Sequence, residues 1–82
     1  MMVKIKLFAN FREIVGKSEI EIEARTVVEL LKKLSENYPE LRQFISKEGY
    51  VQIFVNLKRI SDLNMKLNDN DTVAILPPVS GG

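Results

Sequence analysis

Apolar and polar residues alternate strictly at the start of the chain. Val3, Ile5 and Leu7 alternate with lysines as far as Phe8, and a period of two is typical of a β-strand with one buried face. Residues 19–23, Glu-Ile-Glu-Ile-Glu, repeat the pattern. We therefore expect two half-buried strands, and we interpret the glutamates as a solvated face that protects a sheet edge rather than as catalytic groups.

A short helical segment is predicted between these two strands. Asn10 is followed three residues later by Glu13, which favours a helix N-cap at Asn10. Gly16 favours a left-handed residue that ends the helix.

The main helix is predicted in the middle of the chain. Thr26 and Glu29 have the spacing of a capping box, and Pro39 places the end of the helix near Tyr38. Residues 41–45 indicate a further short helical piece that belongs to the core. The apolar residues of the main helix recur at helical spacing, at Val27, Leu30, Leu31, Leu34 and Tyr38.

Short strands separated by turns are predicted in the second half of the chain. The acidic and amide residues at 68–71 indicate a turn, with Asn70 at positive φ, rather than a calcium loop, because the EF-hand spacing is missing. In chain order we expect a turn at 48–49, a strand at 51–56, a turn at 57–58, a short segment at 59–61 and a final strand at 72–76.

This order of elements predicts the α+β class. One amphipathic helix must cover one face of a small sheet, and the arrangement is that of a ubiquitin-like β-grasp. We expect a mixed sheet of four to five strands covered on one face by one main helix. We expect residues 1–77 to form the domain and residues 78–82 to form a flexible tail that ends in Gly-Gly.

Composition excludes several kinds of chemistry. The 82 residues include no Cys and no His, so there is no disulfide, no thiolate nucleophile and no imidazole base. The net charge is +1 with acids and bases interleaved, which does not favour nucleic acid as a partner. No apolar run is long enough to span a membrane, and we see no signal peptide. We expect a cytoplasmic protein with no bound cofactor or metal.

The last six residues, Pro-Pro-Val-Ser-Gly-Gly, carry the candidate chemistry. Gly81 and Gly82 have no Cβ, so they fit a narrow tunnel, and Pro77 and Pro78 favour an extended base. We interpret the tail as a stalk that delivers the Gly82 carboxylate into another protein's active site. A frayed terminus is the alternative.

Strand alternation also predicts a docking face. If Val3, Ile5 and Leu7 face the helix, then Phe8 faces away from it. In the same way, Phe54 faces away if Ile53 and Val55 face the helix, and Leu76 faces away if Val73 and Ile75 do. Exposed apolar patches often mark interfaces, and Arg59, Arg12, Lys4 and Lys6 are candidates for steering charges at its rim. A bulge that shifts the register by one residue is the alternative, because it exchanges the two faces.

Four segments together resemble the small subunits of molybdopterin synthase. They are Lys6-Leu7-Phe8-Ala9 followed by Arg12-Glu13, Val55-Asn56, the turn from Leu67 through Asp69-Asn70-Asp71 to Thr72-Val73, and the closing Pro77-Pro78-Val79-Ser80-Gly81-Gly82. The resemblance covers essentially the whole chain. The family usually has Gly where Asn70 stands, and Asn can adopt the same backbone.

The resemblance implies a sulfur carrier. A ubiquitin-activating-like adenylyltransferase, using ATP and Mg²⁺, then adenylates Gly82, and a sulfur donor protein supplies sulfur to form a thiocarboxylate. Val79, Ser80 and Gly81 then form the tail that enters the large subunit, where sulfur passes to a cyclic pyranopterin precursor of the molybdenum cofactor. No side chain of this protein is implied to be catalytic, so it is expected to be the non-catalytic, sulfur-donating subunit of a sulfurtransferase complex.

Three other functions remain open. The first is a ubiquitin-like modifier joined to lysines of other proteins through Gly82. The second is a sulfur carrier for thiamine or tRNA thiolation, and the third is an adaptor whose tail is inert.

Overall fold

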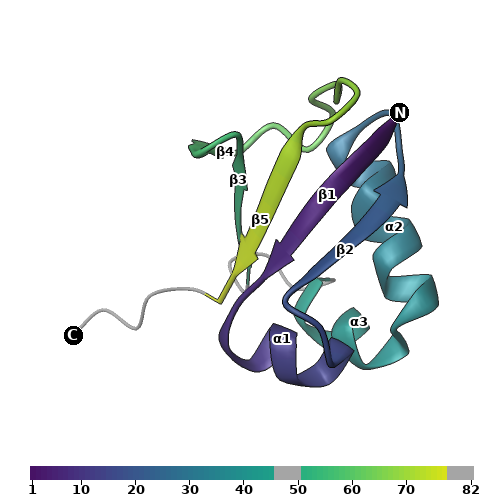
Figure 1. Ribbon diagram of the computed structural model, residues 1–82, viewed down its shortest axis with the longest axis vertical. Helices are drawn as coiled ribbons and strands as arrows, with labels where there is room; N and C mark the ends of the chain where they lie inside the picture. The colour runs from purple at the N-terminus through teal and green to yellow at the C-terminus, as the bar shows by residue number, and fades with distance from the viewer. Residues whose placement is uncertain (46–50, 78–82) are drawn as a thin grey trace.

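A five-stranded mixed sheet forms the frame of the protein (Figure 1). The computed structural model describes residues 1–45 and 51–77. The order of strands across the sheet is β2-β1-β5-β3-β4; β1 and β5 are parallel and the other neighbours are antiparallel. The strands are β1 (Met2–Leu7), β2 (Glu19–Glu23), β3 (Gln52–Val55), β4 (Lys58–Ile60) and β5 (Thr72–Leu76).

Helices cover one face and one end of this sheet. The main helix α2 (Val27–Asn37) lies along one face, while α1 (Ala9–Val15) and α3 (Arg42–Ile45) lie near the end at which β1 and β5 finish (Figure 1). A 3-10 turn, η1 (Pro39–Leu41), joins α2 to α3. The expected α+β β-grasp is confirmed. The predicted turn at residues 48–49 lies outside the described residues.

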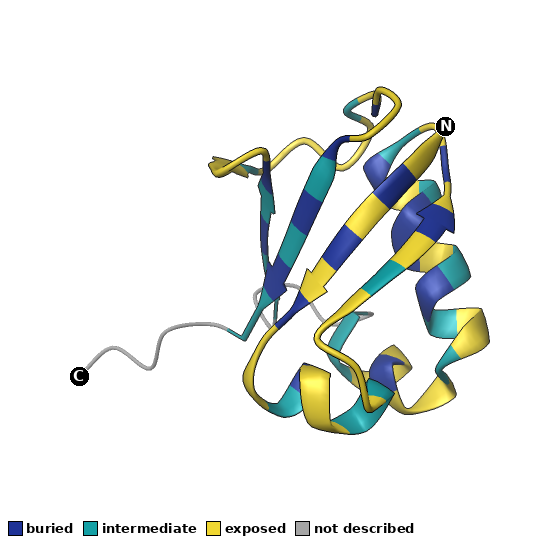
Figure 2. Ribbon diagram, in the orientation of Figure 1, coloured by how far each residue is buried: buried dark blue, intermediate teal, exposed yellow. Residues whose placement is uncertain are grey.

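The core lies between the sheet and α2. Alternate residues of β1 are buried, as the dark and light bands along the strand show (Figure 2). The predicted helical stripe is confirmed, because four of its members are buried and Tyr38 is half-buried. The four are Val27, Leu30, Leu31 and Leu34. The three glutamates of β2 are exposed on an edge strand, as predicted.

Local signals in the sequence explain several boundaries. The backbone N–H of Glu29 donates to Thr26 Oγ1 at 3.2 Å, and the Glu29 carboxylate accepts from the backbone N–H of Arg25 at 3.2 Å. The predicted cap is therefore present, with the return bond one residue earlier than in a standard capping box. Gly16 ends α1 at φ 83°, and Asn70 has φ 69°, both as predicted.

The predicted N-cap at Asn10 is wrong. Helix α1 begins at Ala9, Phe8 is its N-cap, and no side chain caps it. The cause is the backbone of Ala9, which has φ 51° and turns the chain into the helix directly after β1. Positive φ is uncommon for alanine, so the sequence carries no signal for it.

The predicted turn at residues 57–58 is also wrong, by one residue. The turn consists of Asn56 and Leu57, with φ 50° and 72°, and Lys58 already belongs to β4. Two consecutive residues at positive φ are typical of the tight turn that joins paired antiparallel strands. The strand pattern continues through Asn56 in the sequence, so the predicted turn begins one residue too late.

Candidate functional site

The chain leaves the sheet next to Phe8. Because β1 and β5 are parallel with Leu7 opposite Ile75, both strands finish at the same end of the sheet. Leu76 is the last residue of β5 and pairs with Gln52 of β3. Gly82, Gly81, Ser80 and Val79 lie outside the described residues, so the structure places the root of the tail but not its tip.

Beside this root lies the sheet face opposite α2, which we call the open face. Phe8 is 41% exposed, whereas Phe54, Ala74 and Leu76 are half-buried. Phe54 pairs with Ala74 across β3 and β5, and its neighbours Ile53 and Val55 are buried. These residues give the open face an apolar centre along β5 and β3.

Charged residues border the apolar centre. Lys4 and Lys6 of β1 are exposed and stand opposite Glu21 and Glu19 of β2. On the other side, Arg59 of β4 is exposed and pairs with Phe54. Across the open face, an acidic edge is therefore followed by a basic strand, an apolar centre and a second basic strand.

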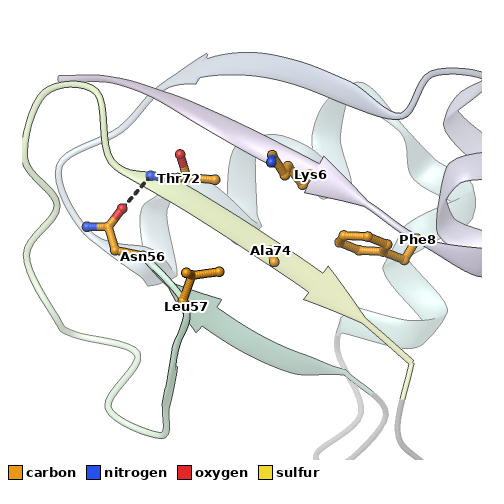
Figure 3. A pocket seen from close by; sticks show the side chains of 6 residues that line it. All are labelled: Lys6, Phe8, Asn56, Leu57, Thr72 and Ala74. Atoms are coloured by element: carbon orange, nitrogen blue, oxygen red, sulfur yellow. Dashed lines mark hydrogen bonds between the residues drawn. The ribbon is translucent and has the colours of Figure 1, made fainter.

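A shallow hollow of about 450 Å³ lies within the open face (Figure 3). It is lined by Lys6, Phe8, Asn56, Leu57, Thr72 and Ala74. Phe54 and Leu76 do not line it. A smaller hollow of about 300 Å³ shares Lys6 and Phe8 with the larger one and includes Arg12. Phe8 thus lines two depressions near the root of the tail.

Hydrogen bonds of Asn56 fix one wall of the larger hollow. Its Oδ1 accepts from the backbone N–H of Thr72 at 3.0 Å (Figure 3), and its Nδ2 donates to Asp71 Oδ1 at 2.9 Å. The other oxygen of Asp71 accepts from the backbone N–H of Asn68 at 2.8 Å. This network ties the β3–β4 turn to the beginning of β5, and it confirms the predicted turn at 68–71.

Sequence reasoning missed Asn56 and Leu57 as parts of this surface. Asn56 was expected within a strand and Leu57 within a turn without a role. An asparagine at the end of a strand is a signal for positive φ, and that signal could have placed the turn. Nothing in the pattern indicates that the leucine beside it is 95% exposed.

The open face carries groups suited to binding. They are apolar side chains, ammonium and guanidinium cations, an amide, a hydroxyl and, at the β2 edge, carboxylates. Among residues 1–45 and 51–77, no three His, Cys, Asp or Glu side chains gather in a way that would hold a metal ion. Within the same ranges, no helix combines the length and the apolarity needed to cross a membrane.

The fold defines the class of protein: a ubiquitin-like β-grasp, with the last strand in the middle of the sheet and the C-terminal residues following directly from it. Within that class, the model of the ThiS family matches residues 5–82. The chain belongs to the ThiS family.

Individual relatives agree with this assignment. The molybdopterin synthase sulfur carrier subunit of Dictyostelium discoideum is 39% identical, over 96% of this chain and 94% of that protein. The small archaeal modifier protein 1 of Methanosarcina acetivorans has a TM-score of 0.87 and 36% identity, over 99% of this chain and 96% of that one. One chain in the complex of subunits 1 and 2 of the Helicobacter pylori molybdopterin-converting factor matches with a TM-score of 0.73 and 29% identity. The match covers 100% of this chain and 100% of that one.

These comparisons confirm the predicted resemblance to molybdopterin synthase small subunits. They support a sulfur-carrier role. The support is coarse, because the relatives include a modifier protein as well as a sulfur carrier subunit.

Proposed function

We propose that the protein is the cytoplasmic sulfur carrier subunit of molybdopterin synthase and that the carboxylate of Gly82 is the group charged with sulfur. The observation that carries the proposal is the position of β5. This central strand ends at Leu76, at the same end of the sheet as Phe8, and the segment Pro-Pro-Val-Ser-Gly-Gly follows it directly in the sequence. The 39% identity to a named sulfur carrier subunit supports the choice within the family.

Two partner-catalysed steps charge the carrier. The Gly82 carboxylate attacks the α-phosphate of ATP on an adenylyltransferase, pyrophosphate leaves, and an acyl-adenylate forms. Hydrosulfide (HS⁻) supplied by a donor protein then attacks the acyl carbon, AMP leaves, a proton is released, and the acyl group becomes a thiocarboxylate. The carboxylate needs this activation because oxide is a poor leaving group. No side chain of the carrier is required, and neither ATP nor Mg²⁺ is a resident cofactor of this chain.

Delivery uses the tail and the open face together. Val79, Ser80 and Gly81 enter the large subunit and bring the sulfur of Gly82 to a cyclic pyranopterin precursor. Meanwhile Phe8, Phe54, Leu76 and Arg59 hold the carrier on that subunit's surface. Aromatic and arginine side chains at the centre of an interface commonly carry most of its binding energy.

Intact mass spectrometry tests this function directly. The full chain is incubated with its activating enzyme, ATP, Mg²⁺ and a sulfide source, and the expected product is heavier by the difference between sulfur and oxygen. Adding the large subunit and the pterin precursor should return the mass to that of the carboxylate. A chain that continues past Gly82 without processing, or one that never gains sulfur, contradicts the proposal.

A second function has a specific observation in its favour. The likeness to a small archaeal modifier protein supports conjugation of Gly82 to lysines of other proteins, since the same acyl-adenylate serves both reactions. Proteomic digests of the source cells distinguish the two. Trypsin cleaves after Lys66, the last basic residue, so the remnant of this chain on a target lysine is residues 67–82. Remnants of this kind that disappear when this gene is deleted indicate a modifier.

A further inference from the structure

Leu57 contributes little to the stability of this chain. Its side chain is 95% exposed, so it adds almost nothing to the core. Its φ of 72° lies in the left-handed region, which a residue with a Cβ occupies at a cost in free energy. Glycine is the preferred residue at the second position of such a turn. A leucine at this position is unfavourable for two reasons: its apolar side chain is exposed to water, and its backbone lies in the left-handed region.

The position of Leu57 suggests what offsets these costs. Leu57 and Phe8 lie on opposite sides of Ala74, with Lys6 at the border of the same hollow (Figure 3). Ala9, directly after Phe8, is also at positive φ, at 51°. Residues in sparsely populated backbone regions tend to gather at functional sites. Here they support the two apolar walls of one hollow, and the small side chain of Ala74 leaves the space between them open.

We infer that Leu57 is a second anchor of the open face, opposite Phe8, and that the hollow between them receives an apolar side chain of the molybdopterin synthase large subunit. The inference rests on the proposed function. Lys6 borders the hollow, so the partner's apolar side chain should be accompanied by a carboxylate that meets this ammonium group. The anchor of the partner is therefore apolar with an acidic neighbour.

The length of the tail favours the large subunit as the occupant. Residues 78–82 span at most about 16 Å beyond the described chain, so a protein that encloses Gly82 must lie close to the root of the tail. Ala74 of the hollow lies on β5, two residues before Leu76, where that strand ends. A partner that holds the tail is thus in position to cover the hollow as well. A second copy of this chain has no comparable reason to lie there.

Affinity measurements with the purified large subunit test the inference. Leu57→Gly removes the anchor and suits the turn, so we expect at least about a tenfold rise in Kd together with an unchanged or higher melting temperature. Ala74→Met fills the hollow and should weaken binding similarly. Val28→Ala is the matched control: Val28 is an apolar residue of α2, 45% exposed, away from the open face, and its Kd should stay within about twofold.

Failure of the inference differs from failure of the proposed function. If Leu57→Gly binds like the wild type, while the wild type binds and transfers sulfur, the inference is overturned and the proposed function stands. If the wild type neither gains a thiocarboxylate nor binds the large subunit, both are overturned. Should size-exclusion chromatography reveal a dimer that Leu57→Gly dissociates, the occupant is a second copy and the stated partner is wrong.

Discussion

At the scale of single residues, Asn56 shows how one side chain meets two demands. Its backbone occupies φ 50°, which asparagine tolerates better than most residues. Its amide group also offers both an acceptor and a donor, which Thr72 and Asp71 use at 3.0 and 2.9 Å. Glycine would satisfy the backbone alone, and serine or alanine would satisfy neither demand fully.

Two substitutions separate these contributions. Asn56→Gly keeps the backbone favourable but removes both side-chain hydrogen bonds, so we expect a loss of about 1–3 kcal/mol in the free energy of unfolding. Asn56→Ala adds the strain of a left-handed alanine, about 1 kcal/mol more. Urea denaturation measures both. Asn64→Ala, in an exposed loop, is the control, and equal stabilities of the two Asn56 variants would contradict the backbone argument.

Phe8 provides a residue-scale test of docking. Because Phe8 is 41% exposed, Phe8→Glu loses only a partly buried ring and should lower the free energy of unfolding by about 1–2 kcal/mol, which leaves the domain folded. The introduced carboxylate in the apolar centre should nevertheless raise the Kd for the large subunit by at least about tenfold. Val28→Glu, an equal change on α2, should not affect binding. If both variants bind as tightly as the wild type, Phe8 is not part of the interface.

At the scale of elements, the sequence predicts most of the fold because most elements have a regular period. Alternation in β1 and β2 and the helical stripe of α2 follow from which side each residue must bury. The two errors fall at connections, at Ala9 and at Asn56-Leu57. At Ala9 and Leu57 the backbone adopts positive φ at residues that disfavour it, so local sequence gives no signal there. Asn56 does carry a signal, because asparagine tolerates positive φ, and that signal favours the turn that the structure has.

The same distinction explains what was predictable about the candidate site. Phe8, Phe54 and Leu76 were assigned to the open face by alternation, which depends only on register. Leu57 was missed because a turn has no period from which orientation can be predicted. The hollow itself was also beyond the sequence, since it depends on residues of β1, β5 and the β3–β4 turn coming together.

Phe11 is the buried residue of helix α1, while Ile14 and Val15 pack against the core partly buried. The packing of Phe11 yields an element-scale prediction. Phe11 is 1% exposed and packs edge-on against Phe44, with ring centroids 5.4 Å apart and planes at 77°. Phe11→Ala should lower the free energy of unfolding by about 3–5 kcal/mol. Phe11→Leu retains most of the volume and should cost clearly less. Thermal or chemical denaturation measures both, and a near-neutral Phe11→Ala would show that α1 is not held by this contact.

At the scale of the whole molecule, folding and chemistry use different parts of the chain. The buried core residues of the described chain all lie between Val3 and Ile75, whereas the proposed reactive group is Gly82. The first part builds the sheet, the open face and the direction of β5. The second part contributes the carboxylate and the length of chain that carries it into the partner protein. We therefore expect the last residues of the tail to be removable without loss of the fold, whereas the tail needs the folded domain for delivery.

Deletion of Gly81-Gly82 tests this separation. The two glycines carry no side chain that could be buried in the core, so we expect the free energy of unfolding to change by less than about 0.5 kcal/mol. The open face should still compete with the full chain for the large subunit, at reduced affinity, because the face remains while the tail contacts are lost. Thiocarboxylate formation and sulfur transfer should be abolished, as followed by intact mass and by pterin product. Sulfur transfer that survives the deletion would show that the reactive group lies elsewhere. A large loss of stability would instead show that the tail belongs to the folded domain. The division of the chain into a folded part and a reactive tail would then be wrong.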